Sequence, residues 1–141
     1  MTKSIALRIS AGVLTAMLLA TTGGVLSAGA SSGPKLTVTP STNLKNGETV
    51  KVSGTGFKKG DSVYVVECLV KAKGGGQCNE LGATPATISA KGVLAPTKFK
   101  VLTGTIGNGK CGTATANLAS CDVSVGNASG GDSASFPIKF K

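Results

Sequence analysis

The chain has 141 residues, with four cysteines, no histidine, no tryptophan and a formal net charge of +9 at pH 7. Without histidine, neither a Ser-His-Asp nor a Cys-His nucleophilic site can form. The length suits one domain and is too short for two well-formed cores.

The first thirty residues differ in composition from the rest of the chain. Lys3 and Arg8 precede an apolar run at 9–19, and small residues close the segment. This pattern predicts a signal peptide, 1–30, cleaved after Ala30 or alternatively after Ala28. The apolar run is shorter than the about 20 residues that a membrane-spanning helix needs, so a secreted protein is expected.

The remaining segment, 31–141, is expected to form a single all-β domain. It is rich in Gly, Thr, Val, Ser and Ala, and it has no long stretch with helical apolar spacing. Short apolar segments alternate with turn residues, which is typical of an immunoglobulin-like β-sandwich with seven strands. The predicted strands are 35–39, 49–54, 62–68, 86–90, 97–102, 121–125 and 134–140.

Two of these strands carry further information. Residues 63–66 are apolar in succession, which predicts a central strand covered on both faces. In the last strand Phe136, Ile138 and Phe140 alternate as a stripe that faces the core, whereas Pro137 falls on the opposite face and indicates an edge strand.

The four cysteines are expected to form disulfides because the chain is predicted to be exported. Three pairings are possible, and the equal spacing favours Cys68 with Cys78 and Cys111 with Cys121. Each bridge would contribute about 2.7 kcal/mol by restricting the unfolded chain. A zinc site is disfavoured by this spacing and by the lack of histidine.

Two apparent catalytic features are better explained as structural. The segment 104–110 has the glycine and lysine spacing of a phosphate-binding loop, but Cys111 stands where Ser or Thr should bind magnesium, so we interpret it as a hairpin leading into a disulfide. Glu67 is the only acid within a strong strand, and we expect it to pair with a lysine on the sheet surface. No enzyme activity is predicted.

Three blocks in order resemble the neocarzinostatin family, the apoproteins that carry enediyne chromophores. They are 36–57, then 63–68 with its partner Cys78, and finally 121–125 followed by 136–140. The resemblance implies a monomeric, secreted, non-enzymatic carrier without a cofactor, which holds an apolar chromophore noncovalently in a cleft flanked by the disulfide-closed loops. It further implies an antibiotic role in which only the chromophore, and not the protein, acts on DNA.

Transferred position by position, the resemblance places Val70, Val101, Leu102, Asp122 and Gly126 in the ligand-binding cleft. Known carriers have aromatic rings at the positions of Val70 and Val101 and a hydrogen-bond donor at that of Asp122. The aliphatic residues and the acid of this chain therefore imply less ring stacking and a ligand that is different, more weakly bound or absent.

The basic charge supports an alternative function. The segment 31–141 has 13 lysines against six acids, a net charge of +7, so it could bind anionic cell-surface polymers as an adhesive immunoglobulin-like module without a small ligand. The lysines are scattered singly and no arginine accompanies them, which is more typical of a solvated surface. A contiguous apolar cleft would distinguish the carrier from this module.

Overall fold

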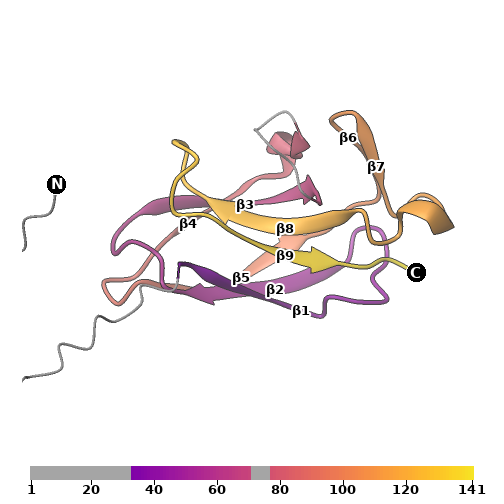
Figure 1. Ribbon diagram of the computed structural model, residues 1–141. Coiled ribbons are helices and arrows are strands. Elements are labelled where there is room, and N and C mark those ends of the chain that lie inside the picture. The colour runs from indigo at the N-terminus through magenta and orange to yellow at the C-terminus, as the bar shows by residue number, and fades with distance from the viewer. Residues whose placement is uncertain (1–32, 71–76) are drawn as a thin grey trace, which may run out of the picture.

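Two antiparallel sheets pack face to face in the computed structural model, which describes residues 33–70 and 77–141 (Figure 1). The predicted signal peptide lies outside the described residues. One sheet has the order β1-β2-β5 and the other β4-β3-β8-β9, and β6 with β7 forms a separate hairpin. The strands are β1 Lys35–Thr39, β2 Thr49–Thr55, β3 Ser62–Leu69, β4 Thr84–Thr87, β5 Val93–Lys100, β6 Gly104–Ile106, β7 Gly109–Cys111, β8 Cys121–Gly126 and β9 Ala134–Ile138.

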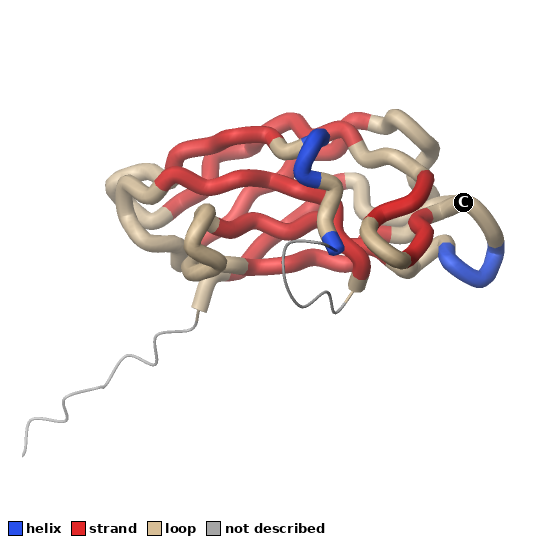
Figure 2. The backbone as a smooth tube through the Cα atoms, turned by 90° about the horizontal axis from the view of Figure 1, so that it is seen from above, coloured by secondary structure: helices blue, strands red, loops and turns tan. Residues whose placement is uncertain are grey.

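This arrangement confirms the predicted all-β sandwich, whose two main sheets contain seven strands within the described residues. Two short 3-10 helices, η2 (Glu80–Gly82) and η3 (Thr115–Asn117), lie outside the sheets. Figures 1 and 2 show η2 on the outer side of the four-stranded sheet, away from the three-stranded sheet. No helix among the described residues is long and apolar enough to cross a membrane.

The core lies between the sheets, where strands such as β1 and β2 bury every second residue toward the opposite sheet. In β1 and β2 the buried positions include Val38 and Val52, and in the opposite sheet they include Val65 and Val123. Phe136, Ile138 and Phe140 face the core as predicted, with Phe136 only partly buried. The predicted strand 134–140 is too long, because β9 ends at Ile138 and Phe140 follows it in an isolated bridge with Leu44. The buried members of the core cluster are Leu36, Val38, Leu44, Val50, Val52, Phe57, Val63, Val65, Ile88, Leu94, Phe99, Val101, Ile106, Cys111, Cys121, Val123, Val125, Ile138 and Phe140.

Proline explains why two strands were predicted to start too late. The predicted strands 86–90 and 97–102 start directly after Pro85 and Pro96, whereas β4 and β5 contain these prolines and begin earlier. Both are edge strands. On the open side of an edge strand there is no neighbouring strand to receive a hydrogen bond, so the missing N–H of a proline is tolerated there. Pro137 likewise lies in an edge strand, β9, as predicted.

The prediction for the third strand holds in position but not in burial. β3 is central, between β4 and β8. Its inner face, with Val63 and Val65, is buried, but on its outer face Tyr64 is 45% exposed. The outer face of the sheet at β3 is therefore accessible to solvent, whereas the sequence predicted that it would be covered.

Both predicted disulfides are present, Cys68–Cys78 and Cys111–Cys121. The segment 104–110 forms the predicted hairpin, in which β6 pairs with β7 and Gly107 adopts a positive φ of 52° at the turn. β7 ends at Cys111, so the second disulfide ties this hairpin to the start of β8.

Candidate ligand-binding cleft

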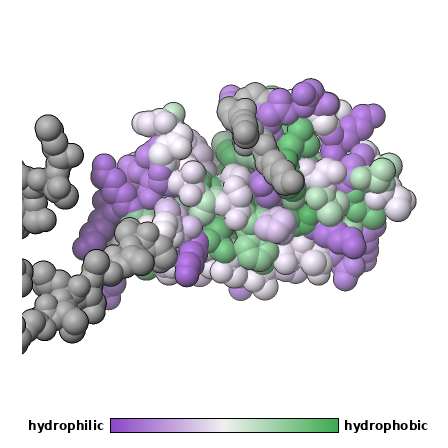
Figure 3. Space-filling view, in the orientation of Figure 1, coloured by the Kyte–Doolittle hydropathy of each residue, from purple (hydrophilic) through white to green (hydrophobic). Residues whose placement is uncertain are grey.

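A cleft of about 740 Å³ lies on the outer face of the four-stranded sheet. This volume is within the range of small-molecule sites. Figure 3 shows apolar residues gathered mainly in the middle of the visible face of the molecule and hydrophilic residues toward its ends. The cleft is lined by Tyr64, Val66, Cys68, Cys78, Glu80, Ala83, Asp122, Ser124, Val125, Gly126, Asn127, Ala128, Gly130, Ser133 and Ser135.

The pairing of β3 with β8 builds the floor of the cleft. Residues that pair directly across antiparallel strands point to the same face. Tyr64 pairs with Gly126 and Val66 pairs with Ser124. Because Gly126 has no side chain, the Tyr64 ring has no bulky cross-strand neighbour from β8, and its exposed surface faces the cleft.

One wall of the cleft is the segment that carries η2. The Cys68–Cys78 disulfide joins this segment to β3, and the Asn79 N–H donates to the Glu67 carbonyl oxygen (2.7 Å). Figure 1 shows η2 standing above the end of β3. The disulfide and this hydrogen bond therefore hold Glu80, at the start of η2, over the floor.

The opposite wall is the loop between β8 and β9, and Asn127 organises it. The Asn127 Oδ1 accepts hydrogen bonds from the Ser129 and Gly131 N–H groups (3.2 and 3.0 Å), and its Nδ2 donates to Asp61 Oδ2 (2.9 Å). Asn127 thus has a structural role in closing this loop against the turn before β3.

A row of polar side chains crosses the floor. Ser124 Oγ donates to Asp122 Oδ1 (2.8 Å) and lies 2.9 Å from Ser135 Oγ. Since the Ser124 proton is engaged with Asp122, Ser135 is the donor of the second hydrogen bond. Asp122 is only 7% exposed. Burial raises the pKa of this carboxyl above its ordinary value, and the hydrogen bond from Ser124 partly opposes that rise.

The structure brings two of the five predicted site residues into the cleft. Asp122 and Gly126 line it, whereas Val70, Val101 and Leu102 do not. Val70 and Leu102 are partly exposed, at 38% and 37%. Ligand binding by Asp122 and Gly126 stays a prediction.

Val101 is fully buried in the core, so its predicted place in the cleft needs correction. Its N–H donates to the Glu48 carbonyl oxygen (2.9 Å), and its own carbonyl accepts from the Gly47 N–H (2.8 Å). These bonds to the turn before β2 fix the backbone of Val101 on the side of the three-stranded sheet, away from the cleft.

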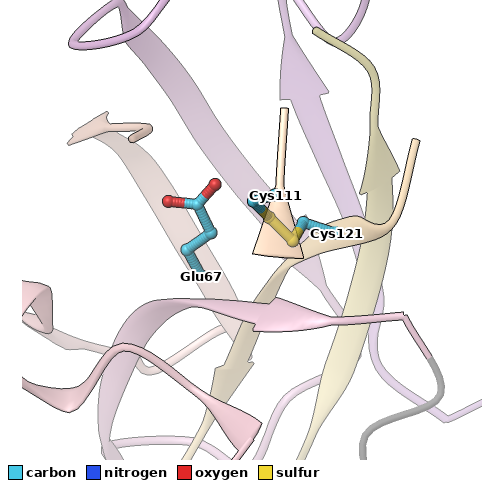
Figure 4. Close-up of side chains that lie close together, drawn as sticks. All are labelled: Glu67, Cys111 and Cys121. Atoms are coloured by element: carbon cyan, nitrogen blue, oxygen red, sulfur yellow. A yellow bond between two sulfur atoms is a disulfide. The ribbon is translucent and has the colours of Figure 1, made fainter. Parts of the chain in front are cut away.

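Glu67 was predicted to pair with a surface lysine, but it is only 1% exposed and lies in the core. Figure 4 shows its carboxylate beside the Cys111–Cys121 disulfide. The Leu102 N–H donates to Glu67 Oε2 (2.9 Å), and Oε1 has no hydrogen-bond partner among the described residues. Burial raises the Glu67 pKa to about 7, although the bond from Leu102 opposes this rise.

Glu67, Cys111 and Cys121 place their ligand atoms within 4.8 Å of one another. Metal ligation by cysteine requires a thiolate, and both sulfur atoms are engaged in the disulfide. In this oxidised form the group is a structural contact between β3 and the hairpin and not a metal site.

Tyr64 is the contribution to the cleft that sequence reasoning missed. It is the single tyrosine of the chain, and it falls within four consecutive apolar residues. The alternation within β3 places Tyr64 opposite to Val63 and Val65, which separates the cleft face from the core face. This alternation could have indicated from the sequence that Tyr64 lies on the outer face of the sheet.

Comparison with known proteins identifies the family. The model of the neocarzinostatin family matches residues 36–140. The chain belongs to the neocarzinostatin family. Macromomycin from Streptomyces macromomyceticus is 34% identical over 102 residues, which are 69% of this chain and 70% of that protein. The antitumor antibiotic C-1027 apoprotein from Streptomyces globisporus is 32% identical over 102 residues, 68% of each chain.

Solved structures of family members agree with the fold. Macromomycin superposes with a TM-score of 0.59 at 34% sequence identity, covering 77% of this chain and all of macromomycin. The solution structure of apokedarcidin gives a TM-score of 0.52 at 28% identity, covering 78% of this chain and all of that protein. Membership in the family is therefore supported both by sequence and by structure.

Proposed function

We propose that this protein is a secreted, non-enzymatic carrier that binds an apolar small molecule of the enediyne chromophore type in the cleft on the four-stranded sheet. The observation that carries the proposal is a cleft of about 740 Å³ with an exposed aromatic ring, Tyr64, on its floor. Two disulfides and a continuous core make the surrounding scaffold rigid, which favours binding by limiting the loss of conformational freedom.

Tyr64 supplies the aromatic surface that the positions of Val70 and Val101 lack. An aromatic pair contributes about 0.5–1.5 kcal/mol beyond the burial of its area. Tyr64 lies on the central strand of the floor, between Pro85 of β4 and Gly126 of β8. A planar ligand in the cleft would stack on this ring while Val66 adds apolar contact.

The role of such a carrier is protection and delivery. It would act as a monomer outside the cell, shield its ligand from water and thiols, and release it to DNA without contacting DNA itself. The alternative of an adhesive module is less well supported, because a module without a small ligand has no need of an open cleft over an exposed tyrosine.

Nuclear magnetic resonance with an apolar probe tests the location of the site. We expect 9-(hydroxymethyl)anthracene to shift the amide resonances of β3, β8 and the segment 77–83 and to leave those of β1, β2 and β5 unchanged. In addition, Tyr64→Leu should weaken binding about three- to tenfold, the equivalent of the stacking energy.

Leu81→Ala is the matched control, since Leu81 is fully exposed and does not line the cleft. It should bind the probe as the parent chain does. Shifts spread over both sheets, or an equal loss of affinity in both variants, would contradict the proposed site.

A further inference from the structure

Lysines and acids are segregated between the two main sheets. The described strands β1, β2 and β5 contain no acid and four lysines, which are Lys35, Lys51, Lys98 and Lys100. The strands of the four-stranded sheet contain two acids, Glu67 and Asp122, and no lysine. Figure 1 shows the two sheets as opposite layers of the sandwich. One layer therefore carries the positive charge of the strands, and the other carries the cleft.

Three of these lysines lie close together on the outer face of the three-stranded sheet. Val50 and Val52 are buried, so Lys51 between them points outward. Lys51 pairs with Lys98 of β5, and Lys100 is on the same face of β5 because it lies two residues further along the strand. Neighbouring strands are about 5 Å apart, and residues two positions apart on one strand are about 7 Å apart. We call Lys51, Lys98 and Lys100 the basic triad.

The charges of the basic triad reinforce one another. Lys51 and Lys98 are directly opposite across the two strands, and like charges in such a pair destabilise a sheet. The spacings are shorter than the Debye length of about 8 Å at physiological ionic strength, so the three fields add. The acid nearest to Lys51 in sequence, Glu48, accepts a hydrogen bond from the Lys45 N–H within the turn before β2 (2.8 Å). A partner with closely spaced negative groups would relieve the repulsion within the basic triad.

The composition of this face favours phosphate as the negative group. Thr39 and Thr49 are cross-strand neighbours of Lys51 and Lys100, and their hydroxyls can donate hydrogen bonds to phosphate oxygens. Lysine binds phosphate as a point charge, whereas arginine, which is absent from 31–141, suits planar carboxylates. Duplex DNA is read by a helix or a ribbon that enters its groove, whereas a flexible chain can lie across a broad sheet face. These features together favour a flexible chain of phosphodiesters.

We propose that the outer face of the three-stranded sheet, centred on the basic triad, binds a flexible polyol-phosphate polymer outside the cell. This inference goes beyond the proposed carrier function and does not depend on it. Because the cleft lies on the other sheet, the protein can hold a small ligand and the polymer at the same time. Binding of this kind would retain the protein at a phosphate-rich cell surface.

Isothermal titration calorimetry with poly(glycerol phosphate) tests the inference. The parent chain is compared with the triple variant Lys51→Gln, Lys98→Gln and Lys100→Gln at salt concentrations between about 50 and 200 mM. Loss of three phosphate contacts should make the slope of log K against log salt shallower by about 2, at about 0.7 per contact for a single chain. At the lowest salt the triple variant should bind more than about tenfold more weakly. All three side chains are exposed, so the midpoint of urea denaturation should not fall.

The matched control is the triple variant Lys59→Gln, Lys91→Gln and Lys110→Gln. It removes the same charge, and its three lysines are exposed and lie outside β1, β2 and β5. It should keep the affinity and the salt dependence of the parent chain. Equal losses in the two triple variants, or no binding by the parent chain, would overturn the inference.

Duplex DNA at the same phosphate concentration serves as the second polymer. Tighter binding of DNA than of poly(glycerol phosphate) would overturn the choice of a polyol-phosphate partner. Both triple variants should still bind 9-(hydroxymethyl)anthracene as the parent chain does, because the basic triad does not line the cleft. Loss of this probe from the basic-triad variant would contradict two independent sites.

Discussion

Replacing Glu67 by Gln should raise the free energy of unfolding by about 3 kcal/mol at pH 8 and leave it nearly unchanged at pH 4. The buried carboxyl has a pKa of about 7 in the folded chain, compared with its ordinary value of 4.5. Each pKa unit corresponds to about 1.4 kcal/mol of differential interaction. Gln retains an oxygen for the Leu102 N–H, so the variant removes the charge and keeps the contact.

The sign of this pH dependence follows from proton binding. Between pH 4.5 and about 7 the folded chain holds a proton on Glu67 that the unfolded chain has released. The contribution of Glu67 to the free energy of unfolding is therefore fully favourable below pH 4.5 and is lost as the pH rises to about 7. Above that window an ionised carboxylate lies in the core beside the disulfide.

Urea denaturation of the parent chain and Glu67→Gln at pH 4 and pH 8 measures this effect. Glu80→Gln, which replaces an exposed acid, corrects for the loss of one negative charge. An equal difference between Glu67→Gln and the parent chain at both pH values would show that Glu67 does not titrate abnormally in the folded protein.

Phe140→Ala should lower the free energy of unfolding by about 3–5 kcal/mol, the typical cost of removing a fully buried ring. Phe140 is 1% exposed and joins the end of the chain to three other segments. Its N–H donates to the Leu118 carbonyl oxygen (2.8 Å), and its backbone forms a parallel bridge with Leu44. A Cβ added to Gly112 would lie 2.6 Å from the ring, so the ring packs directly against this glycine.

Phe136→Ala provides a matched control on the strand that precedes Phe140. Phe136 has the same side chain but is only partly buried against the core. Its loss should lower the midpoint of urea denaturation by much less than the loss of Phe140. Equal effects of the two substitutions would mean that Phe140 does not anchor the C-terminal end of the sandwich.

Four strands could be predicted to within one residue because each is a short, β-branched-rich segment bounded by turn residues. β1 has the predicted bounds, and β2, β3 and β8 differ from their predicted ranges by one residue at the C-terminal end. β4 and β5 could not be placed correctly, since a proline is compatible with a strand only where one side has no partner. Whether a strand lies at an edge depends on the order of the sheet, which is not a local property.

The site was predictable only where it depends on strand pairing. Asp122 and Gly126 lie in a regular strand on the face opposite to the core, so their positions on the floor follow from alternation. Val101 and Glu67 were misplaced because contacts between distant segments decide their burial. Val101 is bonded to the turn at Glu48, and Glu67 is bonded to Leu102. Tyr64 became part of the cleft because, among the described residues, the segments that wall the cleft leave its ring 45% exposed.

Native mass spectrometry tests the carrier function most directly. The protein would be purified from the culture medium of its own producer and compared with the same chain made in a host that lacks the producer's small molecules. We predict an additional noncovalent mass only in the native sample, and its release on unfolding. The bare, disulfide-bonded chain in both samples would contradict the account and favour a protein that binds no small ligand.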